Sequence, residues 1–187
     1  CQSAVNDAAI KRLTGGLAVC STHTGAYCRA RKRLPLDMVS TLTRYTGSVM
    51  SEHTPQSWLW RGRAVRLVDG ASVALPDTAD NQEAYPQPRS QQPGLGFPLC
   101  RLVGIICLAS GAVLNAALGP CRGKGSDEQS LLRSILDTVE DGDILLGDRY
   151  YCSYFLIAML QQKGVDIVFQ LHARRKSDFR RGIRLQT

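Results

Sequence analysis

The sequence of 187 residues lacks several patterns by which common classes of protein are recognised. No two cysteines are spaced as Cys-x-x-Cys, and the run from Cys20 through His23 to Cys28 has no fourth ligand at a suitable spacing, which argues against structural zinc. The seven cysteines are an odd number and are interpreted as reduced thiols. There is no apolar run of about 18 residues and no signal peptide, so we expect a cytoplasmic protein without a membrane partner.

Two enzyme patterns are also missing. The glycine-rich stretch before residue 126 fails the phosphate-loop pattern, because Gly123-Lys124 is followed by Gly125 and Leu118 occupies the position of the first glycine. No serine–histidine–aspartate or cysteine–histidine arrangement is legible around the three histidines. The sequence therefore gives no support for a nucleotide-binding loop of this type or for a hydrolase triad.

Charge is the first positive signal. Lysine and arginine number 23 against 16 acidic residues, which gives a net charge of +7 and favours an acidic partner, with nucleic acid the first candidate. The basic residues predicted to contact DNA phosphates lie before a predicted helix and in the C-terminal tail: Arg122, Lys124, Arg174, Arg175 and Lys176. The alternative for Arg122 and Lys124 is a flexible, solvated loop.

Hydrophobic periodicity predicts an α/β protein with a mixed sheet. Residues 1–60 read as a helical N-terminal segment, and residues 61–187 as a second domain. In that domain three meandering strands precede a helix, a strand, a helix and a strand, which is the ribonuclease H-like order. The predicted elements are strands near 65–75, 99–110 and 112–119, a helix from 126 with Ser126 as N-cap and Gln129 completing a capping box, a strand at 143–147, a helix at 153–164 and a strand at 165–172.

Two aspartates stand out against this order. In a ribonuclease H-like sheet the first and fourth strands are neighbours, so Asp69 on the first and Asp148 after the fourth should lie together. Adjacent carboxylates at a sheet edge can hold Mg²⁺, a hard ion that prefers oxygen ligands, for phosphodiester cleavage. The structural alternatives are a helix N-cap for Asp148 and a turn with Gly70 for Asp69. Asp77 is expected to serve in a turn.

The segments "RLVDGASVALPD" and "GDILLGDRYYCSYF" resemble the insertion-sequence-four family of DDE transposases, and the similarity extends over roughly residues 28–184. The resemblance implies a ribonuclease H-like fold, Asp69 and Asp148 as the first two metal-binding catalytic acids, and Mg²⁺ or Mn²⁺ as cofactor. It also implies double-stranded DNA as partner, paired subunits in the intact enzyme, and a bacterial, nucleoid-associated location. Arg149 stands where the family often has a small residue, and is either neutral or a DNA contact.

One departure from the family concerns the third acid, a glutamate in a tyrosine-arginine-glutamate-lysine signature. After Asp148 the only acidic residues are Asp166 and Asp178, and neither lies in that signature. We therefore expect the front part of a transposase, with a core incomplete at the C-terminus and little cleavage activity of its own. The alternatives are a non-catalytic DNA-binding relic or regulator of transposition and, from another class, an unrelated Mg²⁺-dependent enzyme acting on small phosphates.

Overall fold

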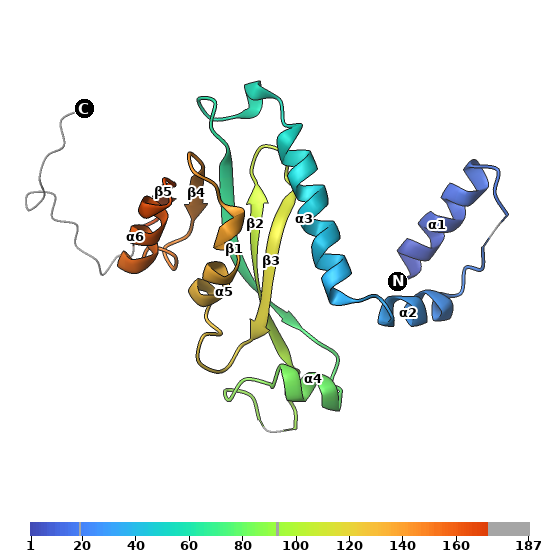
Figure 1. The fold of residues 1–187 in the computed structure, drawn as a ribbon. Coiled ribbons are helices and arrows are strands. Elements are labelled where there is room, and N and C mark those ends of the chain that lie inside the picture. Colours follow the sequence, from blue (N-terminus) through green and yellow to red (C-terminus); the bar gives the residue numbers. More distant parts are fainter. Residues whose placement is uncertain (19, 93, 172–187) are drawn as a thin grey trace, which may run out of the picture. The chain divides into compact units, whose positions relative to one another are not determined.

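A computed structural model describes residues 1–18, 20–92 and 94–171 of the chain. The chain divides into two compact units, residues 1–42 and 43–187. The first unit holds α1 (Gln2–Thr14), α2 (Thr24–Lys32) and the beginning of α3 (Leu36–Glu52), whose remainder belongs to the second unit (Figure 1). The basic residues of α2 gather in its last turn, where cations offset the negative end of the helix dipole.

The second unit is built on a five-stranded mixed sheet with the strand order β3-β2-β1-β4-β5 (Figure 1). The first three strands form antiparallel pairs, whereas β4 runs parallel to β1 and β5 parallel to β4. The predicted α/β class, mixed sheet and ribonuclease H-like order are therefore confirmed. The strands are β1 (Val65–Ala74), β2 (Leu99–Cys107), β3 (Val113–Pro120), β4 (Ile144–Gly147) and β5 (Asp166–Phe169).

The core joins the sheet to the elements between and after its last strands. These are α5 (Glu128–Ser134), the 3-10 helix η2 (Leu136–Thr138) and α6 (Tyr154–Gln162). Val68 of β1, Leu132 of α5 and Leu156 of α6 are completely or almost completely buried and belong to one hydrophobic cluster. Burial alternates along the first half of β1, as expected for a strand with one face against a core.

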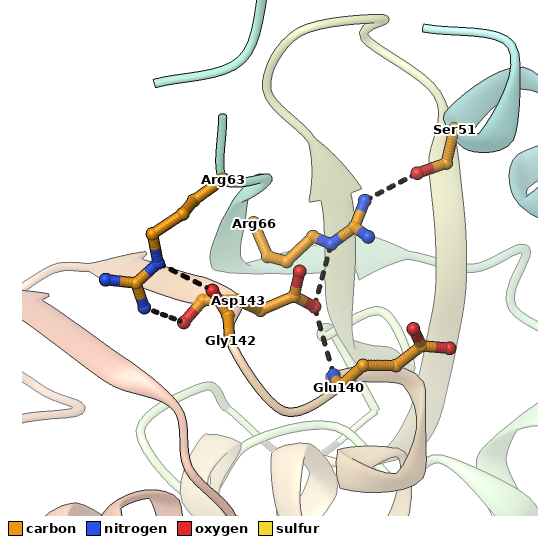
Figure 2. Close-up of polar contacts among 6 residues, drawn as sticks. All are labelled: Ser51, Arg63, Arg66, Glu140, Gly142 and Asp143. Carbon is orange, nitrogen blue, oxygen red and sulfur yellow. Dashed lines mark hydrogen bonds and ion pairs between the residues drawn. The ribbon is translucent and has the colours of Figure 1, made fainter. Parts of the chain in front are cut away.

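A buried ion pair joins the beginnings of β1 and β4. The Arg66 Nε donates to Asp143 Oδ2 at 3.0 Å, and the side chains are only 10% and 7% exposed (Figure 2). A second guanidinium nitrogen of Arg66 donates to Ser51 Oγ of α3 at 2.7 Å, so the buried cation is shared between two partners. A buried charge is tolerated only when it is paired and hydrogen-bonded, as it is here.

Arg63 supports the same junction from the chain before β1. Figure 2 shows its guanidinium donating to the carbonyl oxygens of Gly142 at 2.8 Å and Asp143 at 3.2 Å. Arg63 also pairs with Asp166 at the start of β5. Hydrogen bonds from a charged guanidinium to backbone carbonyl oxygens require a defined geometry, so a shift of one strand along another would break them. Arg63 and Arg66 thus help to set the register of β1, β4 and β5, and with it the place where β4 ends.

Two local predictions are corrected by the structure. The helix predicted from Ser126 begins at Glu128, and its N-cap is Asp127, whose carboxylate accepts from the Ser130 backbone N–H at 3.0 Å. Ser126 instead donates its hydroxyl to the Gly123 carbonyl oxygen. The sequence also predicted no helix between the first two strands, and there the short helix α4 (Ala79–Ala84) forms with Thr78 as its cap.

Candidate metal centre

Asp69 lies inside β1 and not in a turn. It is paired with Gly104 of β2, and the next residue, Gly70, is paired with Val103, so the alternative of an Asp69-Gly70 turn is wrong. The Asp69 side chain is exposed, and its Oδ1 accepts from the Gly70 backbone N–H at 2.9 Å. The carboxylate is therefore presented to solvent from a position where β1 is paired with β2.

Asp148 follows the last residue of β4. The helix N-cap alternative is wrong, because α6 begins only at Tyr154 and is capped by Ser153, whose Oγ accepts from the Leu156 N–H. Asp148 Oδ1 accepts from the Tyr150 backbone N–H at 2.8 Å, which turns the chain away from the strand. Gly147 precedes it at a point where an added Cβ would lie 2.9 Å from Val68 Cγ1, so a larger residue does not fit.

The strand register brings these two aspartates together. Leu67 of β1 is paired with Leu146 of the parallel strand β4, and Asp69 and Asp148 each follow two positions later. They therefore lie alongside one another near the end of β4, at the edge where open α/β sheets bind ligands. Two exposed carboxylates, each with Oδ1 engaged by a backbone N–H, are a donor set that suits a hard divalent ion.

Tyr151 lies three residues after Asp148. Its side chain is completely buried, and its hydroxyl donates to Glu128 Oε2 at 3.3 Å. Burial raises the pKa of the Tyr151 phenol far above its ordinary value, and the negative charges of Glu128, Asp148 and Asp69 raise it further. The phenol is thus a hydrogen-bond donor to Glu128 and lies near enough to Asp148 and Asp69 for their charges to raise its pKa.

Glu128 was not among the predicted site residues. Its carboxylate lies against Gly70, where an added Cβ would come within 2.5 Å of Oε2. Arg101 of β2 lies beside it, with Nε 4.0 Å from Oε1, an ion pair without a hydrogen bond. The sequence signal for this contact is the glycine after Asp69, but a glycine alone does not say which side chain fills the space.

The predicted basic residues are only partly placed. Arg122 is half-buried and its Nε has no hydrogen-bond partner among the described residues, whereas Lys124 and Arg149 are exposed. Arg122 and Lys124 belong to the loop between β3 and α5, and Arg149 directly follows Asp148. The predicted tail residues Arg174, Arg175 and Lys176 lie outside the described residues.

No third acid joins the pair in the described part of the chain, where no group of three metal-ligating side chains is close enough to hold an ion. Asp166 is excluded because it opens β5 opposite Ile144, at the other end of the strand from Asp148, and is paired with Arg63. Asp178 lies outside the described residues. No helix in the described ranges is long and apolar enough to cross a bilayer.

The family model described as Transposase DDE domain matches residues 60–186, well over half of the chain. The chain belongs to this family, and its similarity to the insertion-sequence-four branch is confirmed by two relatives from Escherichia coli K12. The putative transposase InsZ is 31% identical over 140 residues, 74% of this chain and 46% of the relative. The transposase InsG for insertion sequence element IS4 is 28% identical over 133 residues, 71% of this chain and 29% of the relative.

The chain thus spans less than half the length of either curated relative it matches. Among solved structures, the piggyBac transposase in a synaptic complex with hairpin DNA aligns with a TM-score of 0.41 at 10% identity. That alignment covers 60% of this chain and 24% of the other. Membership of a family of DDE domains implies a requirement for a divalent metal ion.

Proposed function

We propose that this chain carries two of the three acids of a DDE transposase, with Asp69 and Asp148 as catalytic metal ligands and Mg²⁺ or Mn²⁺ as the ion. The observation that carries the proposal is the parallel register of β1 and β4, in which both aspartates follow the Leu67–Leu146 pair by two residues. The whole protein would cleave DNA at the ends of an insertion sequence and join those ends to target DNA. Ions bound there would supply the Lewis acidity for phosphodiester cleavage.

In this proposal the chain's own groups hold and orient the ion. Asp69 presents its carboxylate from β1, which is paired with β2 at this position and with β4 two residues earlier. Asp148 presents its carboxylate from the first residue after β4, where its turn to Tyr150 fixes the side chain. The hydroxyl of Tyr151 donates to Glu128, and burial and nearby carboxylates raise the pKa of this phenol, so it adds no negative charge to the site.

Metal binding to the chain is the direct test. We expect Mn²⁺ to bind residues 1–187 and the binding to be lost in Asp69→Asn and in Asp148→Asn, as measured by electron paramagnetic resonance of free Mn²⁺. Glu140→Gln is the matched control, because it removes one negative charge from an exposed side chain outside the pair. Binding that survives both aspartate substitutions, or that falls equally in the control, would contradict the proposed site.

We further propose that Arg122, Lys124 and Arg149 contact the DNA backbone, together with the tail residues Arg174, Arg175 and Lys176. The net charge of +7 and the exposed side chains of Lys124 and Arg149 support this assignment. Phosphate contacts release counterions, so the affinity should fall steeply as salt rises.

The test of these contacts is the salt dependence of duplex binding. Each substitution Arg122→Ala, Lys124→Ala or Arg149→Ala should weaken binding for all sequences and lower the slope of log K against log salt by about 1. Arg44→Ala is the control, because that guanidinium is already paired with Asp137. An unchanged slope in all three variants would exclude these residues as phosphate contacts.

A second candidate function follows from the absence of a third acid beside the pair in the described residues. A non-catalytic DNA-binding protein of this kind would compete with the intact enzyme for element ends and so regulate transposition. Mixing the chain with a separate polypeptide that carries the family's glutamate signature distinguishes the two. Restored strand cleavage favours the enzyme, and inhibition of an intact relative without restored cleavage favours the regulator.

Three further assignments belong to the same proposal. The helical segment 1–60 would contact DNA through the basic last turn of α2, the catalytic domain would comprise residues 61–187, and the intact enzyme would act as a homodimer in the bacterial nucleoid. Deleting residues 1–34, which removes α1 and α2 but leaves α3 whole, should weaken duplex binding while leaving the Mn²⁺ site of the remaining chain intact. A deletion with unchanged DNA affinity would contradict the role of the segment.

A further inference from the structure

The segment that carries Asp148 has little regular structure of its own. Between the end of β4 and the start of α6, its backbone hydrogen bonds are Tyr151 N–H to Asp148 O at 3.3 Å, Cys152 N–H to Arg149 O at 3.4 Å and Ser153 N–H to Tyr151 O at 2.8 Å. The first two are long, and all close short turns. We call residues 148–153 the Asp148 loop, and its shape must be maintained by side chains from other elements.

Gln129 of α5 binds both halves of this loop. Its Nε2 donates to the Tyr150 carbonyl oxygen at 2.6 Å, and its Oε1 accepts from Ser153 Oγ at 2.7 Å. One amide therefore uses its donor and its acceptor on two loop residues, which fixes their separation. Ser153 is also the N-cap of α6, so Gln129 links the loop to the start of that helix.

Glu128, the residue before Gln129, contacts the middle of the loop at Tyr151. Its Oε2 accepts from the buried hydroxyl of Tyr151, and its carboxylate fills the space over Gly70 next to Asp69. The same side chain therefore touches the strand that bears one aspartate and the loop that bears the other. Arg101 on the neighbouring strand balances its charge.

We propose that Glu128 and Gln129 are the positioning residues of the candidate metal centre: they hold the Asp148 loop against β1 so that the carboxylates of Asp69 and Asp148 face one ion. This inference rests on the proposed function and deepens it. It also gives a reason for the glycine after Asp69, because a side chain at position 70 would displace Glu128. Glu128 and Gln129 act through the loop and are not themselves assigned as ligands.

Two charge-neutral substitutions test the inference. Gln129→Ala removes both bonds to the loop, and Tyr151→Phe removes the bond to Glu128 without changing the ring. Gln162→Ala is the matched control, an exposed glutamine of α6. We expect both test variants to bind Mn²⁺ about tenfold more weakly than the wild type, as is typical when a hydrogen bond that positions a metal ligand is lost. The affinity of the control should be unchanged.

A second readout follows the loop without metal. Trypsin cleavage after the exposed Arg149 should be faster in Gln129→Ala and Tyr151→Phe, while cleavage after Arg61, an exposed residue before β1, stays constant. Gly70→Ala should speed cleavage after Arg149 as the two test variants do. Gly104→Ala should leave it at the wild-type rate, because the new Cβ would lie 4.0 Å from its nearest neighbour, the Asn115 carbonyl oxygen.

The outcomes separate the inference from the function on which it rests. Faster cleavage at Arg149 together with weaker Mn²⁺ binding supports the inference. Unchanged cleavage, or faster cleavage with Mn²⁺ affinity equal to the wild type, overturns it. A wild-type chain whose Mn²⁺ binding does not depend on Asp69 and Asp148 overturns the proposed metal centre, whatever the loop variants show.

Discussion

At the residue scale, the pair Arg66–Asp143 is the interaction whose loss should cost most. Arg66→Ala leaves the Asp143 carboxylate buried at 7% exposure without its counter-ion, and an uncompensated buried charge costs about 3–5 kcal/mol. We expect the free energy of unfolding, measured with a chemical denaturant, to fall by that amount. Strand register is expected to suffer as well, because the same pair joins the starts of β1 and β4.

The exposed pair Arg44–Asp137 provides the matched control. Its side chains are 53% and 62% exposed, and surface pairs of this kind contribute about 0–1 kcal/mol. Arg44→Ala should therefore change the free energy of unfolding only slightly. Equal effects of the two arginine substitutions would show that the burial of Arg66 does not carry the stability assigned to it.

The raised pKa of Tyr151 predicts how the free energy of unfolding changes at alkaline pH. Its folded-state pKa is raised above the ordinary value of about 10, so above that pH the unfolded chain ionises while the folded chain does not. The contribution of Tyr151 is fully present below pH 10 and is lost as pH rises toward the folded-state pKa. The free energy of unfolding, followed from pH 8 to 12, should fall more steeply in the wild type than in Tyr151→Phe; parallel curves would refute this.

The candidate centre shows what can be predicted from residue types. The proximity of Asp69 and Asp148 can be predicted from the sequence, because the strand order alone makes their strands neighbours. Glu128 and Gln129 cannot, because their contacts depend on how α5 packs against a loop about 20 residues further along the chain. A glutamate at the start of a helix is ordinarily interpreted as a partner of the helix dipole. That interpretation gives no reason to expect the hydrogen bond of Glu128 with Tyr151.

At the element scale, the start of α5 is the feature to test. Asp127→Ala removes the N-cap bond to the Ser130 N–H and should lower the free energy of unfolding by about 1 kcal/mol. Asp127→Asn keeps a cap acceptor and should cost less at pH 7. A denaturant titration of both variants measures this, and equal losses would mean that the cap acceptor is not what matters.

Acid should weaken the same cap. The hydrogen bond from Ser130 is the main cause of a lowered pKa for Asp127. A depressed folded-state pKa contributes stability that is present above the unfolded value of about 4 and is lost as pH falls through the folded-state pKa. The difference in stability between wild type and Asp127→Asn should therefore shrink below pH 4.

The elements that were predicted correctly are those with long apolar patterns. The β1 run, the hairpin of β2 and β3, and the strands on either side of α6 each carry enough alternation or apolar content to be read without tertiary information. The N-cap of α5 was placed one residue too early, because Ser126 and Asp127 are both good caps and the choice depends on which side chain reaches an N–H. Helix α4, with six residues, is too short to show a helical period.

At the scale of the whole molecule, the number of carboxylates at the candidate centre limits what the chain can do alone. The described residues supply two and no third. Two carboxylates hold a divalent ion less firmly than three, and preorganised charge is the main source of rate enhancement at such sites. In the described residues Glu128 is engaged by Tyr151 and lies beside Arg101, and Asp166 is paired with Arg63. A third ligand role for Asp166 would break its pair with Arg63, and one for Glu128 would draw charge away from Arg101 and Tyr151.

We therefore expect residues 1–187 to bind duplex DNA but to nick it little or not at all. A supercoiled plasmid carrying element ends, incubated with the chain and Mg²⁺ or Mn²⁺, should stay supercoiled at protein concentrations that fully retard a duplex in a gel. Addition of a polypeptide with the family's glutamate signature should restore nicking, and Asp148→Ala should abolish the restored activity. Robust nicking by the chain alone that is lost in Asp148→Ala would show that two aspartates suffice, or that Glu128 leaves Tyr151 to complete the site.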